Sequence, residues 1–98
     1  MKVFSNILDM VGQTPMLEIK NIDTGKCRLF LKLELMNPAG SIKDRIGVSM
    51  IEEAEKRGDL KPGDTIVEAT AGNTGLGLAL AAAQKNYPLI LVLPDKMS

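Results

Sequence analysis

The 98-residue sequence has no histidine, no tryptophan and a single cysteine, Cys27. One cysteine cannot form an intramolecular disulfide, and without histidine the chain lacks the ligand set of a Cys/His zinc site. We therefore expect no metal site and a reducing compartment, the cytoplasm. Aromatic residues make up only 3% of the chain, which argues against base-stacking platforms and aromatic cages.

A net charge and long hydrophobic runs are also missing. The twelve basic and twelve acidic residues cancel, and without a run of like charge the sequence gives no support to a nucleic-acid-binding surface. No stretch of about eighteen apolar residues occurs, so we expect no membrane-spanning helix, and the N-terminal stretch MKVFSNILDM does not have the pattern of a secretory signal. The length and the 45% hydrophobic content suit one small domain. A soluble cytoplasmic chain that acts on a small molecule is the expectation.

Hydrophobic periodicity predicts an α/β fold. Strands are expected at residues 28–35, 65–69 and 89–93, and helices at residues 42–56 and 73–86. Gly58 supplies a C-terminal stop for the first helix. The last three elements follow in the order strand, helix, strand, which predicts a right-handed parallel βαβ unit. The continuous apolar run at 89–93 is typical of a parallel strand covered on both faces. Because the sequence stops just after this strand, we expect a longer protein, or a domain that completes itself with a partner.

The stretch NPAGSIKDR, Asn37–Arg45, places Lys43 at the expected entrance of a helix. A positive charge is poorly placed there, because the first turn presents unpaired N–H groups and the positive end of the helix dipole. An amine is a nucleophile only when it is unprotonated, and a helix N-terminus with apolar surroundings disfavours the ammonium form. Lys43 therefore suits Schiff-base formation. The alternative is a solvated lysine that pairs with Asp44 or Glu34, as many lysines do.

A second motif, EATAGNTGLG at Glu68–Gly77, leads from an expected strand into an expected helix. Several backbone N–H groups and two hydroxyls converge there, which predicts a small anion site. The glycine spacing is not that of a dinucleotide fingerprint, and no Gly-Lys-Ser/Thr follows as in a P-loop, so a carboxylate is favoured as the ligand. The alternative is an ordinary turn in which Thr70 or Asn73 only caps the helix.

Together the two motifs resemble the cysteine synthase and cystathionine β-synthase family of pyridoxal-phosphate enzymes, the fold-type II group that also contains the tryptophan synthase β subunit. The matching stretches are VGQTP (11–15), KLELMNPAGSIKDRIG (32–47) and EATAGNTGLGLALAAA (68–83). The resemblance implies a parallel three-layer α/β sandwich, incomplete in this chain. Residues 1–34 would begin the large domain, and residues 35–98 would form the first half of the small N-terminal domain. The family is usually homodimeric.

The resemblance also implies roles for single residues. Lys43 would bind pyridoxal 5'-phosphate covalently, as the internal aldimine, and would then remove the substrate α-proton. Asn73 would hydrogen-bond the ring hydroxyl oxygen of the cofactor. The loop that binds the substrate α-carboxylate would consist of Thr70, Ala71, Gly72, Asn73 and Thr74. Three further matching residues would hold the loop and helix in place: Asn37, Asp44 and Arg45.

The implied reaction is β-replacement on an activated serine, O-acetylserine, by a thiol or sulfide, giving cystathionine or cysteine in cysteine biosynthesis or transsulfuration. Ala71 stands where cysteine synthases usually have serine. In having alanine there, the chain is more similar to the bacterial cystathionine β-synthases that use O-acetylserine. The family's phosphate-binding loop and the serine at the pyridine nitrogen lie beyond these 98 residues, so the chain alone is expected to be inactive. Three alternatives stay open: elimination as in threonine deaminase, a non-catalytic truncated α/β module that binds a carboxylate or a partner protein, and a nucleotide-phosphate binder.

Overall fold

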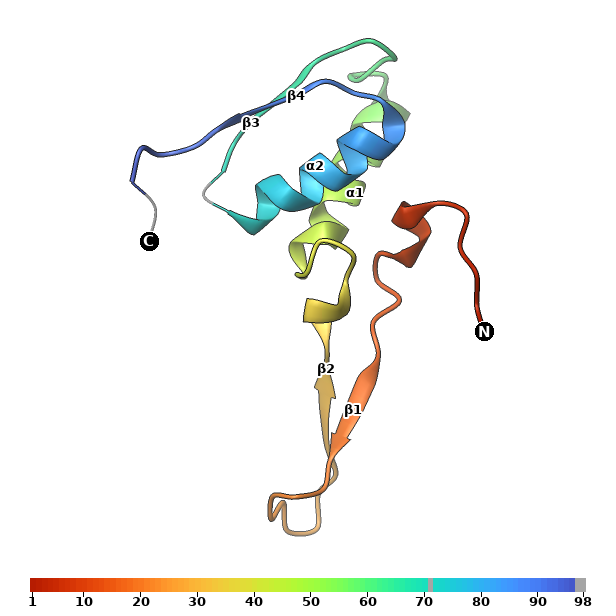
Figure 1. The fold of residues 1–98 in the computed structure, drawn as a ribbon, viewed down its shortest axis with the longest axis vertical. Helices are drawn as coiled ribbons and strands as arrows, with labels where there is room; N and C mark the ends of the chain where they lie inside the picture. Colours follow the sequence, from red (N-terminus) through yellow and green to blue (C-terminus); the bar gives the residue numbers. More distant parts are fainter. Residues whose placement is uncertain (71, 97–98) are drawn as a thin grey trace.

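The structure of the chain is a computed structural model that describes residues 1–70 and 72–96. The elements follow in the order η1 (Ile7–Met10), β1 (Met16–Ile19), β2 (Leu29–Lys32), η2 (Glu34–Met36), α1 (Lys43–Arg57), β3 (Ile66–Ala69), α2 (Asn73–Lys85) and β4 (Leu89–Val92), where η1 and η2 are short 3-10 helices. The molecule is elongated, with extents of 54 × 38 × 23 Å, because the β1–β2 hairpin projects away from a body that contains both α-helices (Figure 1).

Two separate two-stranded sheets are present in the described residues. Strands β1 and β2 are antiparallel, with Met16 opposite Lys32. Strands β3 and β4 are parallel, with Ile66 opposite Leu89, and α2 connects them. The predicted parallel strand–helix–strand unit is therefore confirmed.

The two α-helices begin and end close to their predicted limits. Helix α1 ends at Gly58, whose left-handed conformation (φ 77°) lets its N–H group donate to the carbonyl oxygens of Ala54 and Glu55. Helix α2 ends in the same way at Asn86, with φ 63°. In the described part of the chain, no helix is long and apolar enough to cross a membrane.

The prediction of a strand over 28–35 was wrong in its C-terminal part. Strand β2 ends at Lys32, and residues Glu34–Met36 form the 3-10 helix η2. The backbone turns there because the N–H groups of Met36 and Asn37 donate to the carbonyl oxygens of Leu33 and Glu34. The apolar pattern extends past the end of the strand, and hydrophobic periodicity carries no information on the backbone hydrogen bonds that end it.

The prediction that residues 89–93 are covered on both faces was also wrong for this chain. Leu89 and Leu91 are half-buried, whereas Ile90 and Val92 are 55% and 54% exposed. Helix α2 packs on one face of the β3–β4 pair, since Leu91 lies against Gly75 of α2. No described residue covers the other face to a similar degree.

The hydrophobic core lies between α1 and α2, and Ile66 of β3 and Leu89 of β4 pack against it. It consists of Ile51, Leu78, Ala81, Ala82 and Tyr87. Two of these five residues are alanines, whose small side chains let the two helices approach closely. This close packing fixes the position of the N-terminal end of α1 next to the first turns of α2.

Candidate functional site

The crossing of α1 and α2 brings the two sequence motifs together. Lys43 is the first residue of α1, and its backbone carbonyl packs directly against Gly77, in the second turn of α2. Asn73 is the first residue of α2, one turn before Gly77. Two stretches that lie about thirty residues apart in sequence therefore meet at the N-terminal ends of two helices.

Lys43 takes part in no ion pair among the described residues. Its backbone N–H group donates to Ser41 Oγ at 3.1 Å, which satisfies one of the unpaired donors of the first turn of α1. The side chain belongs to a half-buried residue. Asp44 and Glu34, the two partners that a solvated lysine was expected to find, bind other groups instead. The ion pair that the solvated-lysine alternative predicted for Lys43 is therefore absent among the described residues.

Asp44 is completely buried (0% exposed) at the start of α1. Its Oδ2 atom accepts a hydrogen bond of 2.5 Å from the N–H group of Ala39. Its Oδ1 atom has no hydrogen-bond partner among the described residues. The N–H group of Gly40 donates to Asn37 O at 2.8 Å, which closes the turn that precedes α1. Asp44 therefore ties this turn to the helix that begins with Lys43.

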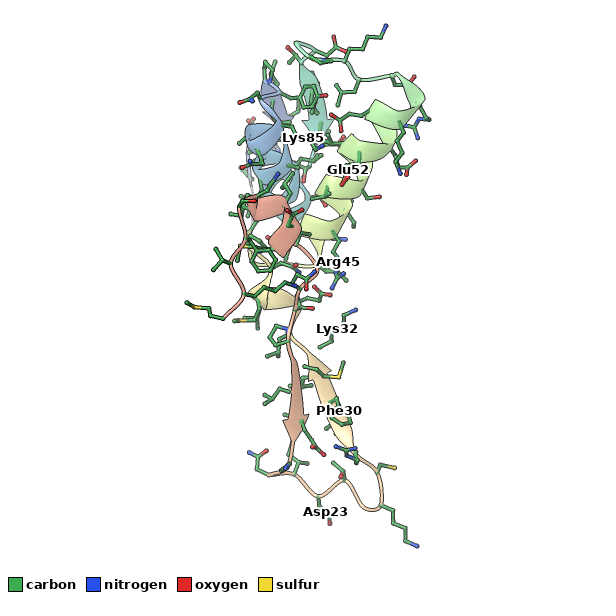
Figure 2. The ribbon with its side chains drawn as sticks, turned by 90° about the vertical axis from the view of Figure 1, so that its right-hand side faces the viewer. Asp23, Phe30, Lys32, Arg45, Glu52 and Lys85 are labelled. Carbon is green, nitrogen blue, oxygen red and sulfur yellow. The ribbon has the colours of Figure 1, made fainter. Side chains whose placement is uncertain are left out.

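Arg45 joins three parts of the chain where the hairpin meets the body (Figure 2). Its Nε atom donates to Glu34 Oε1 at 2.9 Å, and its Nη2 atom lies 3.3 Å from both Gly12 O and Thr14 Oγ1. The side-chain oxygen of Asn37 accepts from the N–H group of Gly12 at 2.8 Å. The hydrogen bond from Arg45 holds the pKa of the Glu34 carboxyl below its usual value. These bonds agree with the holding role expected for Asn37, Asp44 and Arg45.

The loop before α2 is organised by Thr70. Its Oγ1 atom accepts hydrogen bonds from the N–H groups of Gly72 (3.3 Å) and Gly75 (3.1 Å). Thr70 thus caps α2, as the ordinary-turn alternative predicted for this residue. Gly72 and Asn73 are exposed and Thr74 is half-buried, so this helix end is accessible to a ligand. Ala71, the remaining residue of the predicted loop, lies outside the described residues.

Two features of the site were missed by the sequence analysis. Ser41 caps Lys43, and its position two residues before the helix was a signal of this capping. Gly47 and Gly77 are the residues at which α1 and α2 touch. A glycine inside a helical pattern is unfavourable, and it often indicates close packing.

A groove of about 710 Å³ lies elsewhere, between α1 and β3. Its lining includes Met50, Ala54, Ile66 and Leu78, and it contains neither Lys43 nor a described residue of the 70–74 loop. Lys43 and the exposed N-terminus of α2 are therefore separate from this groove.

Comparison with known families and proteins gives a consistent result. A family model described as "Pyridoxal-phosphate dependent enzyme" matches residues 7–98. The cystathionine β-synthase of Mus musculus is 55% identical over 100 residues, which cover 99% of this chain and 18% of the mouse protein. The cysteine synthase of a Flavobacterium species is 53% identical over 95 residues, which cover 97% of this chain and 31% of that enzyme.

Solved structures agree with the sequence comparison. A hydrogen sulfide-producing enzyme from Fusobacterium nucleatum has a TM-score of 0.92 and 49% identity, over 99% of this chain and 32% of its own. An O-acetylserine dependent cystathionine β-synthase from Helicobacter pylori has a TM-score of 0.87 and 40% identity, over 100% of this chain and 33% of its own. The chain thus spans between about a fifth and a third of the length of these relatives.

Proposed function

The chain belongs to the family of pyridoxal-phosphate dependent enzymes, and on this premise we propose that it supplies the lysine and the carboxylate-binding loop of an enzyme for β-replacement on an activated serine. The activated serine is O-acetylserine, and a thiol or sulfide replaces its acetate group to give cystathionine or cysteine. Names of similar proteins support this choice, since they include cystathionine β-synthase, cysteine synthase and an O-acetylserine dependent enzyme.

The predicted resemblance and the predicted fold are confirmed. The family match and the two TM-scores identify the chain as an incomplete α/β part of the fold shared by these pyridoxal-phosphate enzymes. Pyridoxal phosphate as the cofactor of the family is confirmed with them. The activity of the whole protein is a proposal, because the matches cover a minor part of each relative.

The observation that carries the proposal is the place of Lys43. Its amine has no ion-pair partner among the described residues, and its backbone touches the helix whose exposed N-terminus follows Thr70. These residues are chemically suited to the cofactor, since a lysine amine can bond to it covalently and the N–H donors at the start of α2 suit an anionic group. When bound, pyridoxal phosphate supplies an electron sink that stabilises the carbanion left by loss of the α-proton.

Within this proposal each predicted site residue has a task. Lys43 would hold the cofactor through Nζ, and once the substrate amine has displaced Nζ, the released amine would accept the substrate α-proton. Asn73 would hydrogen-bond the ring hydroxyl oxygen of the cofactor. The α-carboxylate is bound by the loop, whose members are Thr70, Ala71, Gly72, Asn73 and Thr74. Because the Thr70 hydroxyl already accepts two N–H groups of its own loop, it serves the carboxylate as a donor.

The domain division, the homodimer and the cytoplasmic location are parts of the same proposal. Residues 1–34 begin the large domain and residues 35–98 form the first half of the small domain. The projection of the β1–β2 hairpin away from the body supports this division for residues 16–32 (Figure 1), whereas η1 contacts α2 and Leu8 packs against the core of the body. The cytoplasm is supported by Cys27, an exposed free cysteine that suits a reducing compartment.

The test is product analysis with the protein expressed from its natural gene. The protein, loaded with pyridoxal phosphate, is incubated with O-acetylserine and with homocysteine or sulfide, and mass spectrometry identifies the product. We expect cystathionine or cysteine from the wild type and neither from Lys43→Ala. A keto acid formed without any thiol would identify elimination instead, and no product with either acceptor would overturn the proposal.

One observation favours a second candidate, a non-catalytic module that binds a partner. The side chains of Val67, Ile90 and Val92 form an exposed apolar face on the β3–β4 pair, and parallel sheets are usually covered on both faces. This candidate predicts no covalent uptake of pyridoxal phosphate at Lys43, which the first candidate requires.

A further inference from the structure

Two glycines lie where α1 and α2 cross, and each faces the backbone of the other helix. A Cβ atom at Gly77 would lie 2.4 Å from the carbonyl oxygen of Lys43 and 3.1 Å from Asp44 Cα. A Cβ atom at Gly47 would lie 2.4 Å from the carbonyl carbon of Gly77 and 2.7 Å from Leu78 N. Real Cβ atoms essentially never come closer than 3.0 Å to such neighbours. The two backbones therefore meet at a distance that only glycine permits.

Close approach, rather than backbone conformation, accounts for these glycines. Neither Gly47 nor Gly77 has a positive φ, and both lie inside helices, where glycine is less favourable than any residue except proline. Gly75 differs, because a Cβ atom there would meet side-chain atoms of Thr70 and Leu91 rather than backbone atoms. At Gly77 the obstacle is the backbone of the residue that carries the reactive amine.

A second contact holds the same turn. The buried Asp44, next to Lys43, accepts the N–H group of Ala39 through Oδ2. Its Oδ1 atom has no partner in the part of the chain that the structure describes, so this single hydrogen bond is the polar contact that accompanies burial of the carboxyl group. The backbone of Lys43 is thus fixed against α2 by Gly77, and against the preceding turn by Asp44.

We propose that Gly77 and Asp44 are positioning residues that set the place of Lys43 relative to the loop that opens α2. Asn73 precedes Gly77 by four residues, about 6 Å along the helix axis, so the contact at Gly77 fixes the spacing between Lys43 and that loop. This inference rests on the proposed function, in which Lys43 holds the cofactor and the loop binds the substrate.

The substitution Gly77→Ala tests the first contact. Its methyl group reaches an ordinary contact distance of 3.4 Å only if the carbonyl of Lys43 moves away by about 1 Å, and a displacement of this size at a reacting group can lower a rate about 100-fold. The readout is the rate at which pyridoxal phosphate becomes bound to Lys43, trapped by borohydride reduction and counted by peptide mass spectrometry. We expect this rate to fall by about 10- to 100-fold.

The second contact is tested by two substitutions at Asp44. Asp44→Ala removes the acceptor of the Ala39 N–H group, and we expect it to slow the labelling of Lys43 by about 10-fold or more. Asp44→Asn keeps an oxygen that can accept the same N–H group, so we expect a rate within about threefold of the wild type. Asp44→Leu is the control for space filling, because leucine is of similar size but accepts no hydrogen bond, and we expect it to slow the labelling as Asp44→Ala does.

Gly58→Ala is the matched control, because it is the same substitution at the other end of the α1 region. Gly58 has φ 77° and a Cβ atom there would meet nothing within 4 Å, so alanine strains the backbone and lowers thermal stability without touching Lys43. We expect its labelling rate to equal that of the wild type, which separates loss of stability from loss of position.

All variants are made in the protein expressed from its natural gene, and circular dichroism establishes that they fold. Slow labelling of Gly77→Ala and Asp44→Ala, beside normal labelling of Gly58→Ala, supports the inference. A folded Gly77→Ala that is labelled at the wild-type rate overturns it. If Gly77→Ala does not fold, the Asp44 pair decides, and equal rates for Asp44→Ala and the wild type overturn it. A wild type without label at Lys43 overturns the proposed function itself.

Discussion

Replacing Leu78 by alanine tests whether the contact between α1 and α2 holds this part of the molecule together. Leu78 is 1% exposed and lies in the core with Ile51 and two alanines, Ala81 and Ala82. Removal of a buried leucine side chain costs the lost hydrophobic transfer energy and a further amount for the cavity that remains. Two alanines cannot fill that cavity.

The helices cannot close the cavity either, because their backbones already touch at Gly47 and Gly77. We therefore expect the upper half of the usual range, a loss of about 4 kcal/mol in the free energy of unfolding. That loss is a large part of the stability of a typical small domain, about 5–15 kcal/mol. Leu76→Ala is the matched control on the same helix, since Leu76 is 53% exposed, and we expect it to change the free energy of unfolding by less than about 1 kcal/mol.

Urea unfolding of the 98-residue chain, followed by far-UV circular dichroism, measures both values. The expected result is a much lower midpoint for Leu78→Ala with an unchanged slope, and a nearly unchanged midpoint for Leu76→Ala. Equal losses for the two variants would refute the reasoning, because the helix crossing would then not be where burial is concentrated.

Three further predictions concern hydrogen bonds. The hydrogen bond from Arg45 keeps the pKa of Glu34 below its usual 4.5, so this bond stabilises the fold above pH 4.5 and its contribution is lost as the pH falls through the folded-state pKa. Arg45→Met should therefore show a smaller loss of thermal stability in acid than the wild type. The hydrogen bond to Glu55 raises the pKa of Tyr87 above its usual 10.0, so the contribution of this bond is complete below pH 10 and is lost as the pH rises through the folded-state pKa. Tyr87→Phe should lower the melting temperature at neutral pH and reduce its further fall above pH 10, and an unchanged fall above pH 10 would contradict this. Thr70→Val removes the acceptor of two N–H groups at the start of α2 and should cost about 1 kcal/mol of unfolding free energy, while Thr70→Ser, which keeps the oxygen, should stay near the wild type.

Much of the fold could be predicted from the sequence because the signals are local. Helix α1 combines apolar residues at helical spacing with Gly58 as its stop, and both lie within the helix or next to it. The end of β2 could not be predicted in this way. Residues Glu34–Met36 form η2, and the Glu34 side chain accepts a hydrogen bond from Arg45, eleven residues later. Hydrophobic periodicity carries no information on such a distant partner.

The candidate site was also predictable only in its local features. The sequence indicates Lys43 and the loop before α2 separately, since each stands at a helix N-terminus with its own motif. Their proximity depends on the contact of Gly77 with a residue 34 positions earlier, which no spacing rule predicts. The exposure of one face of β4 could not be predicted for a similar reason. An apolar run such as Leu89–Val92 indicates that a strand needs to be buried, but it does not indicate which segment covers it.

The most direct test of the central claim is to find the residue that binds pyridoxal phosphate. The protein expressed from its natural gene is incubated with the cofactor, reduced with borohydride and digested, and peptide mass spectrometry locates the added pyridoxyl group. We predict a single modified site at Lys43, with no modification of that peptide in Lys43→Ala. A label spread over surface lysines such as Lys26 and Lys61, or the same extent of labelling in Lys43→Ala, would contradict the claim that Lys43 is the cofactor lysine.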